Sequence, residues 1–216
     1  GAERARLFAS GMGAISAALL ASLGAGDHLV TIANVYGPAA RLMGTWLGEK
    51  LGVRASFVDG ADPADFERAL TERTRVIYLE SPSSAKFGLQ DIAAVTALAR
   101  SRGIRVIADN TWATPLHQRT LDLGVDLEIH SVSKYLGGHS DLIAGAVLGR
   151  TELLDGIATV EGELLGARLA PFEAWLLLRG LRTLPARMAA HERGGLAVAR
   201  FLEDHPRVAE VRHPGL

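Results

Sequence analysis

The chain of 216 residues contains no cysteine. This absence excludes disulfide bonds, thiolate catalysis and cysteine-ligated zinc, and it is typical of a reducing compartment, so we expect a cytoplasmic protein. The seven histidines form neither an HExxH motif nor a pair spaced four residues apart, the spacing that places two ligands on one face of a helix. The sequence therefore predicts no metal site.

The sequence also lacks a charge imbalance and a long hydrophobic run. Its 23 basic and 24 acidic residues give a formal net charge of −1, which provides no attraction for nucleic acid or an anionic membrane. The longest apolar stretch, residues 14–25, is too short to span a bilayer, and residues 1–8 are too polar for a signal peptide. We expect neither nucleic acid nor a membrane as a partner.

Short apolar runs alternate with segments of helical spacing along most of the chain. This order predicts an α/β fold with a mostly parallel sheet flanked by helices, in which ligands bind at the carboxyl ends of the strands. Beyond residue 151 the pattern predicts helices over 168–187 and 187–203 and the start of a strand at 207–211. The expected strands are 28–33, 53–58, 76–80, 104–109, 125–129 and 142–148.

One lysine, Lys134, lies between the last two of these apolar runs, preceded by two serines and followed by paired glycines. A free lysine titrates near pH ~10.4, so a nucleophilic lysine needs desolvation or a cationic neighbour. The turn alone leaves two interpretations open, a solvated lysine in a loop and a lysine that forms a Schiff base.

Other polar residues also follow expected strands. Tyr36 and Asp109 stand at strand ends, and the segment Ser10-Gly11-Met12-Gly13 opens a helix, where free N–H groups and the helix dipole favour an anion. Each has an ordinary alternative: a packed ring, a capping carboxylate and a glycine N-cap.

Two common motifs are incomplete. Gly11-x-Gly13 only partly matches a dinucleotide-binding fingerprint, since Ser16 replaces the third glycine and no clear strand precedes it. The segment 138–141 resembles a serine hydrolase elbow, but Leu142 occupies the position of the required glycine.

Lysine, a strand-end aspartate, an anion site and an aromatic ring together match the needs of one cofactor, pyridoxal 5′-phosphate (PLP). The sequence also resembles, over essentially its whole length and in order, the Cys/Met-metabolism family of PLP enzymes. That family includes cystathionine β-lyase, cystathionine γ-synthase, the γ-lyases and the O-acylhomoserine sulfhydrylases. The resemblance implies the large domain of the aspartate aminotransferase-like fold type I, with a sheet of the seven-stranded type. The matching segments are Ser10-Gly11-Met12, Glu80-Ser81-Pro82, residues 109–115, 131–141 and 178–184, and His213-Pro214-Gly215.

The resemblance implies a role for each site residue. Lys134 is the lysine that forms a covalent aldimine with PLP, Asp109 the partner of the pyridine nitrogen, and Tyr36 the stacking ring that also handles protons or the leaving group. The remaining cofactor-binding residues are the amides of Gly11 and Met12, the phosphate-binding hydroxyls of Ser131 and Ser133, and Thr111, which supports the ring. Ser133 departs from the family's usual threonine, although the hydroxyl is kept, and His139, Ser140 and Asp141 are expected to brace the turn.

The substrate implied is a small sulfur amino acid. Ser84, where many γ-type members carry asparagine, and Trp112 favour cystathionine β-lyase, which yields homocysteine, pyruvate and ammonia. The alternatives are a γ-synthase, a γ-lyase, a sulfhydrylase, or a cofactor-binding domain with little activity of its own.

Two features of the family have no counterpart in this chain, an N-terminal Tyr-x-Arg segment and a C-terminal domain with the arginine that binds the substrate carboxylate. We therefore expect a cofactor-binding domain over residues 1–184, with residues 185–216 forming a linking helix and the start of a truncated second domain. By resemblance, the protein is expected to form a homotetramer built from dimers.

Overall fold

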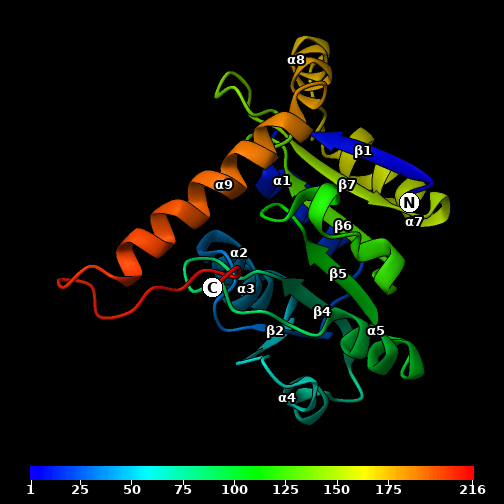
Figure 1. Ribbon diagram of the computed structural model, residues 1–216. Helices are drawn as coiled ribbons and strands as arrows, with labels where there is room; N and C mark the ends of the chain where they lie inside the picture. Colours follow the sequence, from blue (N-terminus) through cyan, green and yellow to red (C-terminus); the bar gives the residue numbers. More distant parts are fainter.

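The computed structural model describes the backbone of residues 1–216 and the side chains of residues 1–159 and 162–216. Seven strands form one sheet in the order β1-β7-β6-β5-β4-β2-β3 (Figure 1). β7 runs antiparallel to both neighbours, and the other pairs are parallel. The predicted α/β fold with a mostly parallel sheet is confirmed. The strands are β1 (Arg4–Phe8), β2 (His28–Ile32), β3 (Arg54–Val58), β4 (Thr74–Glu80), β5 (Arg105–Asp109), β6 (Leu127–Ser131) and β7 (Gly145–Gly149).

Helices fill most connections between the strands. α1 packs against β6 and β7, α5 packs against β5, and the long α9 projects away from the sheet (Figure 1). Among the described residues, no helix has the length and apolar character needed to cross a membrane. The helices are α1 (Gly11–Leu20), α2 (Gly37–Arg41), the π-helical η1 (Leu42–Trp46), α3 (Leu47–Leu51), α4 (Pro63–Ala69), α5 (Ile92–Ser101), α6 (Thr114–His117), the 3-10 helix η2 (Thr120–Leu123), α7 (Thr151–Ile157), the π-helical η3 (Ala158–Leu164), α8 (Pro171–Leu181) and α9 (Leu184–Glu203).

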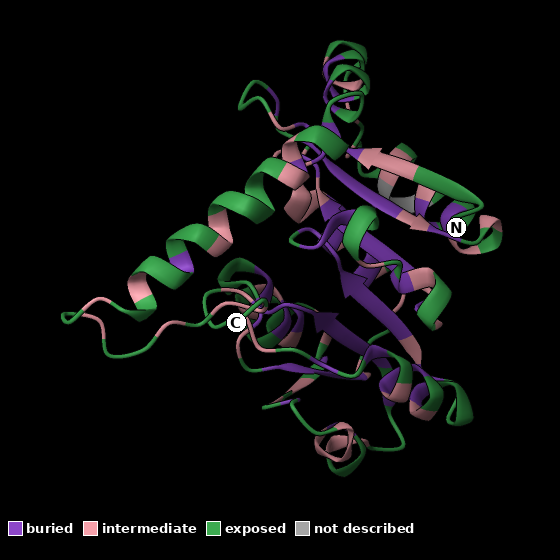
Figure 2. Ribbon diagram, in the orientation of Figure 1, coloured by how far each residue is buried: buried purple, intermediate pink, exposed green. Residues whose placement is uncertain are grey.

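The central strands are buried on both faces, which explains their continuous apolar sequences (Figure 2). Every residue of β2 is buried, and so are all residues of β4 except Arg75. A second, smaller apolar cluster lies under the segment that follows β6. It joins Val132 and Leu136 to Leu176 and Leu177 of α8 and to Met188 of α9. This cluster fixes the segment that carries Lys134 to the two C-terminal helices.

Three details differ from the sequence-based expectations. A strand, β1, does precede Gly11, although none was expected; it is an edge strand whose arginines Arg4 and Arg6 hide the apolar pattern. Residues 207–211, all of them described, form no strand. The two C-terminal helices were expected over 168–187 and 187–203, whereas α8 ends at Leu181 and α9 begins at Leu184, with Pro185 in its first turn, where the missing N–H costs nothing. The division at residue 184 coincides with the start of α9 and stays a prediction.

Candidate active site

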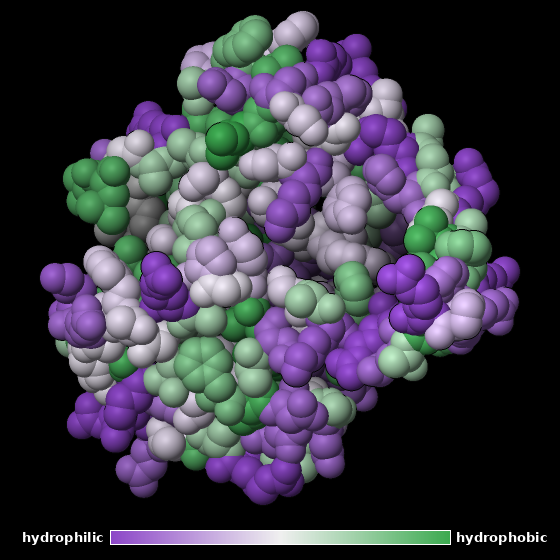
Figure 3. Space-filling view, turned by 90° about the vertical axis from the view of Figure 1, so that its left-hand side faces the viewer, coloured by the Kyte–Doolittle hydropathy of each residue, from purple (hydrophilic) through white to green (hydrophobic). Residues whose placement is uncertain are grey.

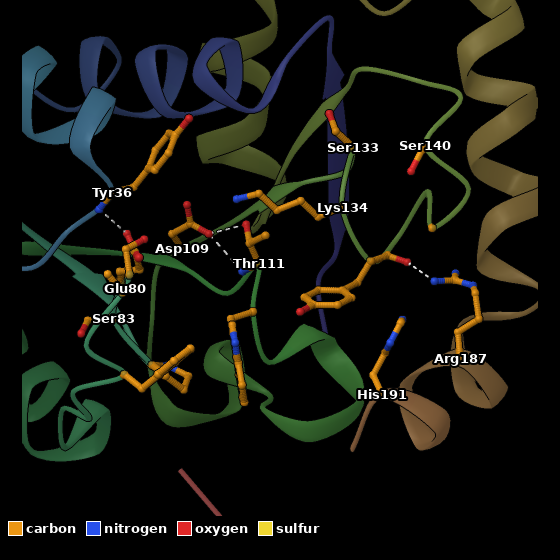
Figure 4. A pocket seen from close by; sticks show the side chains of 17 residues that line it. Tyr36, Glu80, Ser83, Asp109, Thr111, Ser133, Lys134, Ser140, Arg187 and His191 are labelled. Atoms are coloured by element: carbon orange, nitrogen blue, oxygen red, sulfur yellow. Dashed lines mark hydrogen bonds between the residues drawn. The ribbon is translucent and has the colours of Figure 1, made fainter. Parts of the chain in front are cut away.

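A cavity of about 570 Å³ lies at the carboxyl ends of β4 and β5, between the segment after β6 and the first turns of α9. This is the edge of a parallel sheet at which ligands are expected. Among the residues with described side chains, no group of three or more histidine and acidic residues is arranged to hold a metal ion. The cavity is lined by Tyr36, Glu80, Pro82, Ser83, Ser84, Ala85, Phe87, Asp109, Thr111, Trp112, Ser133, Lys134, Tyr135, Gly138, Ser140, Arg187 and His191 (Figure 4).

Lys134 reaches the cavity from a tight turn directly after β6. Gly137 N–H donates to Val132 O at 2.8 Å, and Gly138 N–H donates to Lys134 O at 2.7 Å. Gly138 has a φ of 74°, which favours glycine, and a Cβ on Gly137 would approach Val132 O to 2.8 Å. The paired glycines therefore allow the turn that directs the lysine into the cavity. The ammonium lies 5.2 Å from the centre of the Tyr36 ring, within range of a cation–π interaction.

Asp109 is the last residue of β5 and is 8% exposed. One carboxylate oxygen accepts hydrogen bonds from the Thr111 N–H at 2.9 Å and from the Thr111 hydroxyl. The other carboxylate oxygen points into the cavity (Figure 4). The Thr111 hydroxyl oxygen in turn accepts the Ser131 N–H at 2.8 Å, which connects β5 to the end of β6. Asp109 is thus held rigidly with one oxygen available to a ligand.

Glu80 lies beside Asp109 because the two residues are partners in the β4–β5 ladder. Burial raises the pKa of Glu80, the charge of Asp109 adds to the rise, and hydrogen bonds from Ser84 and Tyr36 oppose it. Burial and the charges of Asp109 and Glu80 raise the pKa of Tyr78 well above its usual range. Two carboxylates in one buried corner favour a cationic ligand.

The N-terminus of α1 lies next to the end of β6. The Ser10 hydroxyl accepts the Gly13 N–H at 3.0 Å, while the N–H groups of Gly11 and Met12 stand in the first turn, where no helical carbonyl is available to them. A Cβ on Gly11 would approach the Ser131 hydroxyl oxygen to 2.9 Å, so only a small residue fits between the two elements.

The structure brings most predicted site residues together. Five of them, Tyr36, Asp109, Thr111, Ser133 and Lys134, line the cavity, as do Ser84 and Trp112. The other three, Gly11, Met12 and Ser131, adjoin the cavity without lining it and connect to it through the Thr111–Ser131 hydrogen bond.

The Ser133 hydroxyl is already engaged. It donates to Ala144 O at 3.2 Å and accepts the Ala144 N–H at 3.0 Å. A hydroxyl has one proton to donate, so binding a phosphate oxygen through it requires release of the Ala144 carbonyl.

The turn is braced from outside. Asp141 forms an ion pair with Arg179 of α8, and His139 Nδ1 contacts Gly137 O at 2.8 Å, while Ser140 lines the cavity.

Sequence reasoning gave no role to several cavity residues. Glu80 is the last residue of its strand, as Asp109 is, so its position in the sequence could have indicated a place in the site. Arg187 and His191 come from the first turns of α9, and no local pattern in the sequence indicates that these turns reach the cavity. Arg187 donates to Tyr135 O at 2.7 Å and to Gly180 O at 2.9 Å, so it ties α9 to α8 and to the Lys134 turn.

The profile of one family, described as Cys/Met metabolism PLP-dependent enzyme, matches residues 1–216, the whole chain. The chain belongs to this family. The resemblance found in the sequence is thereby confirmed, and the family is one of PLP-dependent enzymes of Cys/Met metabolism.

Curated members of the Cys/Met metabolism family are similar over nearly the whole chain. A probable cystathionine gamma-synthase of Herpetosiphon aurantiacus is 44% identical over 216 residues, which are 100% of this chain and 67% of the relative. An L-methionine gamma-lyase of Treponema denticola is 42% identical over 96% of this chain and 52% of its own length. A cystathionine beta-lyase of Coxiella burnetii is 41% identical over 97% of this chain and 54% of its own length. The chain thus spans between half and two thirds of these relatives.

The residues present fit the family's cofactor. The inward-facing oxygen of Asp109 is a buried acceptor suited to a protonated pyridine nitrogen, and the amine of Lys134 is the nucleophile that an aldehyde requires. Gly11, at the start of α1, lies close to Ser131, so backbone amides of the first helical turn and a hydroxyl are available beside the site for a phosphate.

Proposed function

We propose that the complete protein is a PLP-dependent carbon–sulfur lyase that acts on cystathionine or a related sulfur amino acid. The observation that carries this proposal is the placement of the Lys134 amine and the Asp109 carboxylate in the wall of one cavity, on the same edge of the sheet. PLP, when bound, supplies an electron sink for charge that develops at the substrate Cα.

Each residue has a distinct task in this proposal. Asp109 keeps a proton on the pyridine nitrogen, and Thr111 fixes the orientation of its carboxylate. Lys134 would hold the cofactor through its Nζ, and its amine would take the proton from the substrate Cα. The Tyr36 ring covers the cofactor face and its hydroxyl moves a proton near the leaving group, while Gly11, Met12, Ser131 and Ser133 bind the phosphate.

For the regiochemistry we propose α,β-elimination, as in cystathionine β-lyase, which releases homocysteine, pyruvate and ammonia. Its support is that Ser84 and Trp112 both line the cavity. A γ-elimination or γ-replacement is the second candidate, favoured by relatives named cystathionine gamma-synthase and L-methionine gamma-lyase. Both reactions need a base at the position of Lys134, so the residues of this cavity are compatible with either.

Two measurements test the proposal. The chain is titrated with PLP and its visible absorption band is recorded; the band is expected in the parent chain and absent in Lys134→Ala. The full-length protein is then incubated with cystathionine. Pyruvate with homocysteine supports β-elimination, and 2-oxobutyrate with cysteine supports γ-elimination. PLP binding without turnover in the full-length protein would instead favour a cofactor-binding module, and the absence of the band would contradict the proposal.

We also propose that residues 1–184 form the cofactor-binding domain of a cytoplasmic enzyme that assembles as a homotetramer. The exposed apolar face of α8, which includes Phe172, Trp175 and Leu178, supports self-association.

A further inference from the structure

Glu80 is a buried acid in the cavity wall to which the proposed reaction gives no task. It is the last residue of β4, lies beside Asp109 in the ladder and is 7% exposed. A buried carboxylate is costly unless it is hydrogen-bonded, so its partners indicate what it does.

Glu80 has two hydrogen-bond partners, Ser84 and the backbone of Tyr36, and only Tyr36 comes from another strand connection. The Tyr36 N–H donates to Glu80 Oε2 at 2.7 Å, although the two residues are 44 positions apart in the sequence (Figure 4). Tyr36 is the N-cap residue of α2, and its carbonyl accepts the Ala40 N–H at 2.9 Å. The backbone of Tyr36 is therefore fixed at both ends, by a helix on one side and by Glu80 on the other.

This anchoring decides where the Tyr36 ring lies. The ring is 37% exposed and lies 5.2 Å from the Lys134 ammonium. An exposed ring has few packing contacts to hold it, so its direction depends on the position of its backbone. Without an acceptor at residue 80, the Tyr36 N–H loses its partner and the segment between β2 and α2 is free to shift.

We propose that Glu80 is a positioning residue, which acts through the Tyr36 backbone to hold the Tyr36 ring over the cofactor. The proposal rests on PLP binding as described under the proposed function. It requires a hydrogen-bond acceptor at position 80, and glutamine provides one through its amide oxygen, whereas alanine does not.

The test is a double-mutant cycle on the dissociation constant of PLP, with Glu80→Ala, Tyr36→Ala and the double variant. A hydrogen bond of this kind is worth up to about a tenfold change in affinity, so E80A is expected to weaken PLP binding by that factor. In the Tyr36→Ala background the same substitution should change the affinity less than about twofold, because residues that act through one another are not additive. The matched control, Glu80→Gln, should stay within about threefold of the parent chain, since the acceptor is kept.

A second readout needs no cofactor. Amide hydrogen exchange of Tyr36 in the cofactor-free chain should be at least about tenfold faster in E80A than in the parent chain, and E80Q should retain the protection. If E80A does not fold, Glu80→Met, of similar length but without an oxygen, replaces it in both experiments.

The outcomes are distinguishable. The positioning role would be overturned if E80A weakened PLP binding equally in the two backgrounds, or if E80Q bound PLP as weakly as E80A. The proposed function would still be supported in that case, provided that the parent chain binds PLP. Failure of the parent chain to bind PLP would overturn both.

Discussion

At the scale of single residues, the site is a balance of charge in a buried corner. Asp109 and Glu80 are neighbours on adjacent strands, and the cations Lys134 and Arg187 line the same cavity. Burial raises the pKa of Glu80, and the charge of Asp109 adds to this rise. A protonated pyridine ring held by Asp109 would offset this negative charge, which gives a physical reason for PLP to bind here.

The substitution Asp109→Asn tests this balance. It keeps the shape of the side chain but removes the charge that stabilises a protonated ring nitrogen. A hydrogen bond to a charged group contributes about 1.5–3 kcal/mol, so we expect PLP affinity to fall by about 10- to 100-fold. Titration with PLP, followed by the visible absorption band, measures this affinity. Asp91→Asn is the control: Asp91 caps α5 and does not line the cavity, and asparagine caps equally well, so unchanged affinity is expected there.

At the scale of secondary-structure elements, two helices hold the Lys134 turn. Gly180 of α8 packs so closely against the turn that a Cβ would overlap Gly137 O and lie 2.7 Å from Leu136 O. Gly194 of α9, by contrast, has nothing within 4 Å of where its Cβ would stand. Substitution of these two helical glycines by alanine is therefore expected to change the stability of the chain in opposite directions.

Gly180→Ala is expected to destabilise the chain by about 1–3 kcal/mol, because the turn or the helix must move to admit the methyl group. Gly194→Ala should stabilise it by about 0.5–1 kcal/mol, since alanine is the better helix former. Urea unfolding measures both. Equal effects of the two substitutions would contradict the close contact between α8 and the turn.

Strand β2 carries a buried titratable group that links three strands. His28 Nδ1 contacts the Thr74 hydroxyl at 2.8 Å and Nε2 contacts the Ser56 hydroxyl at 2.9 Å. Burial lowers the pKa of His28, and the charge of Arg54 adds to this effect.

The folded chain therefore resists protonation of His28, while the unfolded chain takes up the proton near pH ~6.5. Stability should be complete above that pH and decrease as the pH falls through it towards the lower pKa of the folded state. His28→Gln, which does not titrate, should show a flatter dependence in urea unfolding between pH 5 and 8. Parallel curves for the two proteins would argue against a contribution from His28.

At the scale of the whole molecule, α8 exposes an apolar face. Phe172 and Trp175 are stacked with ring centres 5.9 Å apart, and both are more than half exposed. At the top of Figure 3, the height at which α8 lies in Figure 1, hydrophobic side chains lie on the surface among hydrophilic ones.

If this face mediates assembly, Trp175→Ser should shift the chain towards the monomer in light scattering, because a buried aromatic side chain dominates such contacts. Phe57→Ser, at an exposed residue of β3 at the far edge of the sheet, should leave the molar mass unchanged. A parent chain that is strictly monomeric would contradict self-association through α8.

Much of this architecture could be predicted from the sequence. The parallel strands are readable because burial on both faces makes them continuously apolar, and the strand-end rule brought Tyr36, Asp109 and Lys134 together. The edge strand β1 was missed because one of its faces is charged. The contribution of Arg187 and His191 was also missed, since it depends on the first turns of α9 reaching the cavity, and no local pattern in the sequence indicates that placement.

The walls of the cavity come from segments spread between Tyr36 and His191. A molecule that has lost the order of its sheet has no place to hold the cofactor, so PLP binds the native state alone. By mass action, a free concentration one hundred times the dissociation constant adds about 2.7 kcal/mol to the native state. The melting temperature of the chain should then rise with each addition of PLP, because the cofactor stabilises the folded state and not the unfolded one.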